Sequence, residues 1–380
     1  MKLKGVKIRL YPNKIQEREL NSILGGYRFV YNKCLAYKKE AYEKDKTSID
    51  RSGLSKYFHN TLRVETDWLR LHNTKVMKQS IINLLTAYDK FFKHESDYPV
   101  FKTRHDNQSA RFPLEAIATK PFNEDLTRLN LTKVFKNLRF ECSDKDRRYL
   151  GKHRDKIKSV TIKKKKNGHF YASILIERED NLLAKPISES IGIDLGINYL
   201  MAFSDGGTIE NKKFTRSNEN RYKRLQRQHS RREKGSKNKE KARIKLARKH
   251  EEINNKKLDY LHKLTTKIVS ENQVIILEDL NVKGMMKNHK TAKAIQELSL
   301  HEIKRQLKYK AEWYGREFIQ VDRYFPSSKK CSDCGEINHN LKRGDRIFTC
   351  QCGNNKDRDH NAAINILNEG LRLRELKLTI

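Results

Sequence analysis

Asp194 lies in an otherwise apolar stretch, ESIGIDLGINYLMAF, at residues 189–203. Side chains in a strand alternate between its two faces, so Gly192 and Asp194 are predicted to share one face and the neighbouring isoleucines the other. A carboxylate on a core strand is costly unless a hydrogen bond, an opposite charge or a metal ion compensates it. The pattern therefore marks Asp194 as a candidate for chemistry.

Two other acidic positions accompany predicted core elements. Residues 274–277 form a continuous apolar run typical of a strand covered on both faces, and Glu278 and Asp279 stand at its carboxyl end. Ligands commonly bind at that edge of an open α/β sheet. Asp357 and Asp359 precede the apolar face of a predicted helix, where helix capping alone could account for either of them.

Acids on three separate elements are harder to explain as unrelated structural features. Carboxylates that converge repel one another unless cations lie between them, and carboxylate oxygens are ligands that Mg²⁺ and Mn²⁺ prefer. Two such ions roughly 4 Å apart can activate a water molecule and stabilise the leaving oxygen of a phosphodiester. The acidic set therefore favours metal-dependent nuclease chemistry.

Four of the six cysteines lie close together in a CxxC pair and a CxC pair, separated by fifteen residues: Cys331, Cys334, Cys350 and Cys352. This spacing is close to that of a zinc ribbon, and Gly335 and Gly353 stand where the knuckle turns need positive φ. The CxC pair is one residue shorter than usual. We expect one structural zinc, and we expect the isolated Cys34 and Cys142 to be small buried apolar residues.

The composition points to a polyanionic partner. The chain has 380 residues, of which 36% are hydrophobic and 34% charged, and its 82 Lys and Arg against 47 Asp and Glu leave a formal charge of +35. Two or three domains with nucleic acid as the partner fit these numbers. A membrane is less favoured, because the N-terminus has no apolar core and QVIILEDL is too short to span a bilayer. We expect a cytoplasmic protein, associated with the nucleoid when bound to DNA.

Two segments concentrate the positive charge. One is KSVTIKKKKNGHFYASILIERE, a predicted β-hairpin with a type I′ turn at Asn167-Gly168. Its lysines could lie on a solvated edge strand or contact phosphates, and we favour phosphate contact. The candidate residues are Lys163, Lys164, Lys165 and Lys166.

The other basic segment, residues 211–250, contains 17 Lys and Arg against three Glu. Its pattern predicts two helices with a break near Gly235-Ser236. A solvated coiled coil is the alternative, but exposed helices of that kind usually mix charges at i,i+4 spacing. We expect phosphate contacts from Arg224, Arg227, Arg231, Arg232 and Arg243.

The N-terminal half alternates between strand and helix patterns. Val6, Ile8 and Leu10 have the period of a half-buried strand, and Asn13 with Gln16 is typical of a capping box that begins a helix. The pattern stays helical to about residue 94 and returns to the strand period up to about residue 180. The sequence thus predicts a helical region inserted into a β domain.

Four motifs, IGIDLGIN, IILEDLNV, FPSSKKCSDCG and DRDHNAAINI, resemble in that order the split RuvC-type nuclease of transposon-encoded TnpB (OrfB) proteins, relatives of type V CRISPR effectors. The opening segments of the chain are similar to that family as well. The resemblance implies that Asp194, Glu278 and Asp359 are the catalytic metal ligands. It makes Asp279 and Asp357 neighbours of the site.

The resemblance also implies an α/β multidomain fold, with an RNase H-like (RuvC) core, an embedded zinc ribbon, and a β-barrel wedge domain that carries a helical recognition insert. The corresponding boundaries are 1–13 and 95–185 for the wedge, 14–94 for the recognition domain, 186–326 and 354–380 for the nuclease including a basic helical hairpin at 211–270, and 327–353 for the ribbon.

The implied activity is RNA-guided cleavage of double-stranded DNA beside a short adjacent motif. A transposon-end RNA would be the guide, with Mg²⁺ or Mn²⁺ and Zn²⁺ as cofactors, no membrane partner, and a monomeric ribonucleoprotein as the working form. A DNA-binding transcriptional repressor is one alternative. A transposase or junction resolvase is another, although the sequence has no paired-His motif such as HxH.

Overall fold

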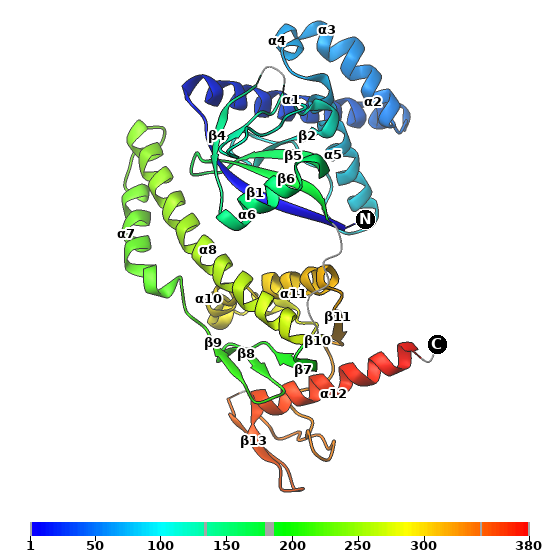
Figure 1. The fold of residues 1–380 in the computed structure, drawn as a ribbon, viewed down its shortest axis with the longest axis vertical. Coiled ribbons are helices and arrows are strands. Elements are labelled where there is room, and N and C mark those ends of the chain that lie inside the picture. Colours follow the sequence, from blue (N-terminus) through cyan, green and yellow to red (C-terminus); the bar gives the residue numbers. More distant parts are fainter. Residues whose placement is uncertain (1, 133–134, 179–185, 343, 379–380) are drawn as a thin grey trace. The chain divides into compact units, whose positions relative to one another are not determined.

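The computed structural model describes residues 2–132, 135–178, 186–342 and 344–378. The chain divides into two compact units, Met1–Glu179 and Asp180–Ile380 (Figure 1). In the described part of the chain, no helix is both long enough and apolar enough to cross a membrane.

The first unit contains a six-stranded antiparallel sheet with the order β2-β5-β6-β1-β4-β3. The predicted N-terminal strand is confirmed, because the side chains of Val6, Ile8 and Leu10 are buried. β2 and β3 are the edge strands, so these pairings do not confirm the expected closed barrel. The strands are β1 (Lys2–Tyr11), β2 (Gln108–Pro113), β3 (Arg128–Leu129), β4 (Leu138–Glu141), β5 (Ile157–Lys164) and β6 (Phe170–Arg178).

Helices follow β1, as the sequence predicts. Asn13 and Gln16 form the capping box at the start of α1, with the Gln16 amide nitrogen donating to Asn13 Oδ1 at 2.9 Å. The helices and the sheet share one hydrophobic core, in which Cys34 is buried while Cys142 is only partly buried. The helices are α1 (Lys14–Asp45), α2 (Arg51–Tyr57), the π-helix η1 (Phe58–Leu62), α3 (Arg63–Glu65), α4 (Asp67–Arg70), α5 (Thr74–Phe92), α6 (Asp144–Lys152) and the 3₁₀ turns η2 (Leu114–Ala116) and η3 (Arg154–Lys156).

The turn between β5 and β6 differs from the predicted type I′ turn. Gly168 has a φ of +84°, but Asn167 is not among the residues with positive φ, as a type I′ turn would require. The Gly168 amide donates to the Lys165 carbonyl and the Lys165 amide to the His169 carbonyl, both at 2.9 Å. A three-residue loop with glycine in the left-handed position therefore closes the hairpin.

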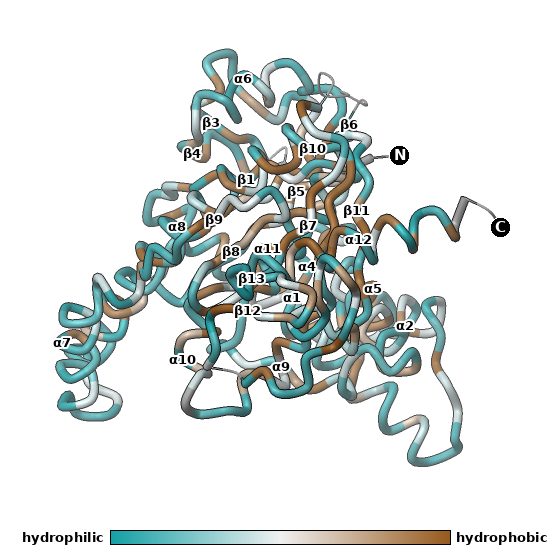
Figure 2. The backbone as a smooth tube through the Cα atoms, turned by 90° about the horizontal axis from the view of Figure 1, so that it is seen from below, coloured by the Kyte–Doolittle hydropathy of each residue, from teal (hydrophilic) through white to brown (hydrophobic). Residues whose placement is uncertain are grey.

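The second unit contains a five-stranded mixed sheet with the order β11-β10-β7-β8-β9. The first three strands are parallel and the last two pair antiparallel. Figure 2 shows hydrophobic residues along β7 and β11 in this sheet. The strands are β7 (Ser188–Asp194), β8 (Tyr199–Phe203), β9 (Thr208–Glu210), β10 (Asn272–Glu278) and β11 (Glu317–Val321), with β12 (Ile347–Thr349) and β13 (Asn355–Asp357) forming a separate antiparallel pair.

Helices cover both faces of this sheet, which explains the continuous apolar run in β10. Ile275 and Leu277 pack in a cluster with residues of α8 and α11, whereas Val274 and Ile276 pack with Ile366 of α12. The helices are the 3₁₀ turn η4 (Arg216–Asn218), α7 (Glu219–Ser230), α8 (Lys237–Glu271), α9 (Val282–Met285), α10 (His289–Leu298), α11 (Leu300–Tyr314) and α12 (Arg358–Leu378).

The predicted basic helical hairpin is confirmed as α7 and α8, which pack against each other. Gly235, with a φ of +89°, lies in the turn between them, and the Ser236 side chain caps α8 by accepting from the Lys239 amide at 3.1 Å. None of the 12 residues of α7 is buried, and Figure 2 colours this helix largely as hydrophilic. The hairpin is therefore held mainly through α8.

Candidate active site and metal centre

Asp194 and Glu278 are the last residues of two neighbouring parallel strands. Ile193 of β7 lies opposite Leu277 of β10, so the next residue on each strand is one of the two acids. Ile193 and Leu277, which directly precede the two acids, pack in the cluster that faces α8 and α11. Because strand side chains alternate between the two faces, Asp194 and Glu278 point to the opposite face, which α12 covers. The register brings the two acids together at the carboxyl edge of the sheet.

Asp359 reaches the same edge because α12 packs unusually close to the strands. A Cβ atom on Gly192 would lie 2.3 Å from the Ala363 carbonyl oxygen, and one on Gly370 would lie 2.3 Å from Ile276 Cγ2. Asp359 precedes Ala363 by four residues, so it shares that helix face. The two glycines thus allow the helix approach that brings Asp359 toward Asp194.

The pKa values of these acids reflect their shared environment. Burial first, and then the negative charges of Asp359 and Glu278, raise the pKa of Asp194 to about 7. Burial also raises the pKa of Glu278 to about 7, although a hydrogen bond from Ser327 partly opposes it. Burial and the charge of Asp357 raise the pKa of Asp359. The surroundings of all three carboxyl groups thus make their ionised forms unfavourable. Such a set fits a site for hard divalent cations, which would stabilise the carboxylate forms.

The two neighbouring aspartates have other partners. Asp279 Oδ1 accepts from Lys304 Nζ at 2.5 Å, and its Oδ2 accepts from Arg323 Nη2 at 2.6 Å. These cations, Arg323 first, lower the pKa of Asp279 to about 2. Asp357 Oδ1 accepts from the backbone amides of Asp359 and the next residue at 2.9 and 3.2 Å. Helix capping thus accounts for Asp357, while Asp359 lies in the first turn.

The four cysteine sulfurs of the predicted ribbon lie within 4.8 Å of one another. The Sγ atoms of Cys331 and Cys352 are 3.6 Å apart, as are those of Cys334 and Cys350. Four thiolates around Zn²⁺ at roughly 2.3 Å would be about 3.8 Å apart, so the donor set fits a tetrahedral zinc. The shortened CxC pair still converges with the first pair, and the following Gly335 and Gly353 have φ of +82° and +91°.

Two asparagines that sequence reasoning missed connect this cysteine cluster to the acidic edge. Asn361 and Asn365 are buried on α12. Asn361 Oδ1 accepts from the Ser332 amide at 3.0 Å, and Asn365 Nδ2 donates to the Ser327 carbonyl at 2.8 Å. The Ser327 hydroxyl in turn lies 3.4 Å from Glu278 Oε2. Their i,i+4 spacing among apolar residues in DRDHNAAINI could have indicated that both lie on the buried face of the helix. Buried amide side chains need hydrogen-bond partners, so this position would have predicted such contacts.

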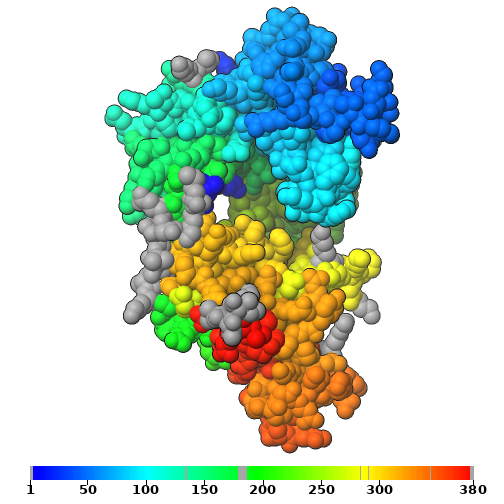
Figure 3. Space-filling model, turned by 90° about the vertical axis from the view of Figure 1, so that its right-hand side faces the viewer, coloured from blue at the N-terminus to red at the C-terminus, as the bar shows by residue number. Residues whose placement is uncertain are grey.

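The segment containing the cysteines forms an exposed lobe next to α12, as the orange surface beside the red helix shows in Figure 3. Cys334 and Cys352 are exposed, whereas Cys331 is buried. Asn354 Nδ2 donates to Cys331 Sγ at 3.2 Å. Such a hydrogen bond favours the thiolate form that a metal requires.

The predicted phosphate-contacting lysines of the β5-β6 hairpin have different surroundings. Lys163 and Lys166 are exposed. Lys164 Nζ donates to Asn21 Oδ1 of α1 at 2.7 Å, and Lys165 Nζ lies 4.8 Å from the centre of the Tyr171 ring. Lys164 is therefore partly engaged within the protein.

The predicted arginines of the helical hairpin are also not equivalent. Arg224 lines a groove of about 530 Å³ between α7 and α8, whose other cations are Arg221, Lys245, Arg248 and Lys249. Arg227 and Arg231 line a second hollow of about 350 Å³. Arg243 instead forms a two-pronged ion pair with Glu240, at 2.7 and 2.6 Å. Arg224 and Arg227 thus lie on α7, Arg231 and Arg232 directly follow its last residue, and Arg243 is neutralised.

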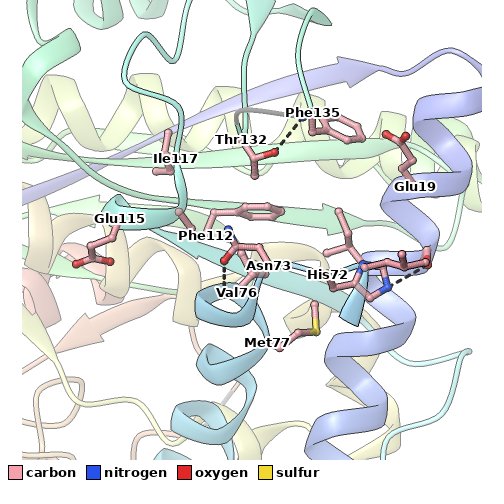
Figure 4. Close-up of a pocket in the computed structure, with 14 residues that line it drawn as sticks. Glu19, His72, Asn73, Val76, Met77, Phe112, Glu115, Ile117, Thr132 and Phe135 are labelled. Carbon is pink, nitrogen blue, oxygen red and sulfur yellow. Dashed lines mark hydrogen bonds between the residues drawn. The ribbon is translucent and has the colours of Figure 1, made fainter. Parts of the chain in front are cut away.

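A cavity of about 610 Å³ lies within the first unit, between α1, α5 and β2 (Figure 4). Its lining is mainly apolar and includes Met77 and Phe112. The clearest polar contact is between Ser22 Oγ and His72 Nε2 at 3.1 Å. None of the predicted site residues lines it.

Three family models match the chain. The OrfB_IS605 model, described as "Probable transposase", matches residues 173–289. A model described as a Cas12f1-like TNB domain matches residues 301–366, which include the cysteine cluster. A helix-turn-helix model matches residues 1–47, which form β1 and α1 in this structure.

Two solved structures share the fold. One, a cryo-electron microscopy structure of a Cas12f1–sgRNA–target DNA complex, has a TM-score of 0.61 at 17% identity, covering 93% of this chain and 83% of that one. The other, the mini RNA-guided endonuclease CRISPR-Cas_phi3, has a TM-score of 0.57 at 12% identity, covering 96% and 92%. At these identities the likeness concerns the mixed α/β fold.

Curated relatives match along almost the whole chain. A protein of Streptomyces pristinaespiralis named "Putative RNA-guided DNA endonuclease" is 36% identical over 97% of this chain and 89% of its own length. InsQ of Escherichia coli strain K12, named in the same way, is 30% identical over 97% and 92%. Together with the OrfB_IS605 match, these relatives show that the chain belongs to the TnpB (OrfB) family.

Proposed function

We propose that the protein is an RNA-guided DNA endonuclease of a transposable element, which hydrolyses double-stranded DNA next to a short adjacent motif. The observation that carries this proposal is the convergence of Asp194, Glu278 and Asp359 at one edge of the sheet. The names of the whole-length relatives support the guided activity. A guide RNA derived from the transposon end and a monomeric ribonucleoprotein are part of the proposal.

The nuclease site would be of the RuvC type, with the three carboxylates as ligands of Mg²⁺ or Mn²⁺. Bound there, divalent ions would lower the pKa of a water molecule and neutralise charge at the scissile phosphate. The chain's own residues position these ligands. Ser327 engages one oxygen of Glu278, and the close approach of Ala363 to Gly192 orients Asp359.

The four cysteines would hold a structural zinc. Through Asn361 and Asn365, α12 is bonded to the segment that leads from the cysteine cluster to Ser327. A folded ribbon would therefore stabilise the orientation of Glu278 as well as its own loops.

Guided recognition requires surfaces elsewhere in the chain that bind nucleic acid. In such complexes base pairing supplies sequence specificity, and the protein holds the heteroduplex through its backbone, which requires positive surfaces. The cations of α7 and α8 and the lysines of the β5-β6 hairpin would serve this purpose. We also propose the wedge, recognition, nuclease and ribbon boundaries given above as the functional division of the chain.

The test is a cleavage assay with the purified ribonucleoprotein and a matched double-stranded target. Asp194→Ala, Glu278→Ala and Asp359→Ala should each abolish cleavage and leave guide and target binding nearly intact, since each removes a metal ligand and no phosphate contact. Asp357→Ala is the matched control, expected to cut while losing about 1 kcal/mol of stability with its helix cap. Full cutting by Asp359→Ala, or no cutting of any guided target by the wild type, would contradict the proposal.

A further inference from the structure

Lys304 and Arg323 share one carboxylate beside the acidic edge. Lys304 of α11 and Arg323, which follows β11, bind the two oxygens of Asp279 at 2.5 and 2.6 Å. Gln320 Nε2 also donates to Asp279 Oδ1, at 3.1 Å. Two cations on one anion leave a net positive charge at this point, directly after Glu278 in the chain.

This cluster opens into a cavity that Glu278 also lines. The cavity has a volume of about 170 Å³, and Lys304, Arg323 and His301 form its basic wall. The side chains of Lys304 and Arg323 are 30% and 41% exposed. The cavity lies on the α11 side of the carboxyl edge, whereas the Glu278 side chain points to the α12 side of that same edge. A ligand in the cavity could therefore contact both cations at the edge of the sheet where the proposed metal ligand lies.

Both cations keep donors for such a ligand. An ammonium group has three N–H donors and a guanidinium group has five. Among the described residues, the hydrogen bonds of Lys304 Nζ and Arg323 are those to Asp279. That carboxylate fixes the direction of the two heads and leaves further N–H groups for an oxyanion.

A purely structural clamp explains this arrangement less well. One cation would neutralise Asp279 and tie β10 to its neighbours, whereas the second adds a half-exposed charge that faces a hollow. Arginine with lysine around one phosphate is a common way to bind a nucleic-acid backbone. The chemistry of the cavity therefore suits a phosphodiester.

We propose that Lys304 and Arg323, oriented by Asp279, bind a DNA backbone phosphate next to the scissile one. This inference rests on the proposed nuclease function, because it assigns the cluster to that same substrate. Lys304 and Arg323 contact the substrate in this scheme, and Asp279 is a positioning residue.

The first experiment combines protein variants with modified DNA. Lys304→Ala and Arg323→Ala should each slow cleavage by roughly 10-fold to 100-fold, the range for losing one hydrogen bond to a charged group. A methylphosphonate, which removes the charge of one phosphate, should slow the wild type similarly at one position flanking the cut. Combining the two changes should cost no more than either alone, because both remove the same contact.

Lys308→Ala is the matched control, since Lys308 lies one turn further along α11 and is exposed. It should cleave unmodified DNA like the wild type, and the methylphosphonate should slow it by the same factor as it slows the wild type. Asp279→Asn keeps both cations but no longer orients them. The methylphosphonate should therefore slow this variant no further, as for Lys304→Ala and Arg323→Ala. Equal cleavage rates for all variants, or multiplied effects at every phosphate position, would overturn the subsite. Thermal unfolding of each variant identifies a loss caused by misfolding.

A second measurement does not need cleavage. Acetylation of lysines in the full-length protein, analysed by mass spectrometry with and without a single-stranded DNA oligonucleotide, should show protection of Lys304 and none of Lys308. Protection in a protein that cuts no guided target would leave the subsite in place and refute the proposed activity. Active protein with an unprotected Lys304 would refute the subsite alone.

Discussion

The Ala363 carbonyl oxygen of α12 occupies space next to Gly192 of β7 that no larger residue could share. A Cβ atom on Gly192 would lie 2.3 Å from that oxygen and 2.7 Å from the Leu367 amide nitrogen. Because Asp194 follows Gly192 by two residues and Asp359 precedes Ala363 by four, this contact sets the separation of two of the three acids. The glycine is thus part of the geometry of the site.

Gly192→Ala should therefore damage the site without touching an acidic residue. The new methyl group would push α12 from the sheet, and we expect a loss of about 1–3 kcal/mol in the free energy of unfolding together with a strong loss of cleavage. Thermal unfolding and the cleavage assay measure both. Gly344→Ala is the control, because a Cβ there meets nothing within 4 Å. Normal activity in the Gly192 variant would show that α12 adapts easily.

The raised pKa values predict a pH dependence of stability in the absence of divalent ions. Asp194 and Glu278 have a pKa of about 7 in the folded protein, against ordinary values of 3.8 and 4.5. At pH values between the ordinary and the folded-state pKa, the folded state holds more protons than the unfolded state. The free energy of unfolding therefore decreases as the pH rises. With a chelator present, the melting temperature of the wild type should fall relative to Asp194→Asn as the pH rises from about 4 to about 7. Added Mg²⁺ should reverse this difference, and parallel curves would argue against a shared acidic centre.

The cysteine cluster should carry about one zinc per chain. Cys331→Ser should release it and lower the melting temperature, since the binding energy of a structural zinc contributes directly to folding. Elemental analysis and thermal unfolding test this. Cys142→Ser, which changes a cysteine outside the cluster, should keep the metal. A folded and active wild-type protein without zinc would contradict the assignment.

The basic hairpin should gain order when it binds nucleic acid. α7 has no buried residue, whereas the second half of α8 buries Leu261, Thr265, Ile268 and Val269. Amide hydrogens of α7 should therefore exchange faster than those of that part of α8 in the free protein, and become protected in the presence of guide RNA and target DNA. Equal protection of α7 in both states would mean that the hairpin is only a structural support.

Charge reversal tests the same hairpin by another route. Arg224→Glu, Arg227→Glu and Arg231→Glu together should weaken nucleic-acid binding and flatten its salt dependence, because each phosphate contact contributes about one unit of slope. Arg243→Gln is the comparison, since Glu240 already neutralises Arg243 and the change should alter the slope little. Affinities measured at several salt concentrations would decide. An unchanged slope in the triple variant would remove α7 from the interface.

The sequence by itself determined the local elements and the chemical types of the site. Strand periodicity identified the buried faces of β1 and β7, the Asn13–Gln16 pair identified the start of α1, and the spacing of the cysteines identified the cysteine cluster. These features depend on residues close together in the chain, which is why patterns of a few residues report them.

Only the tertiary structure decided which of these elements meet. The register of β7 with β10 brings Asp194 beside Glu278, and the packing of α12 brings Asp359 to them. Periodicity shows that one side of an element is buried, but it does not show which element buries it. The hydrogen bonds of Asn361 and Asn365 and the cations around Asp279 therefore depend on long-range packing. Contacts between distant segments are set by the shape and charge of whole elements, and a local pattern carries no record of them.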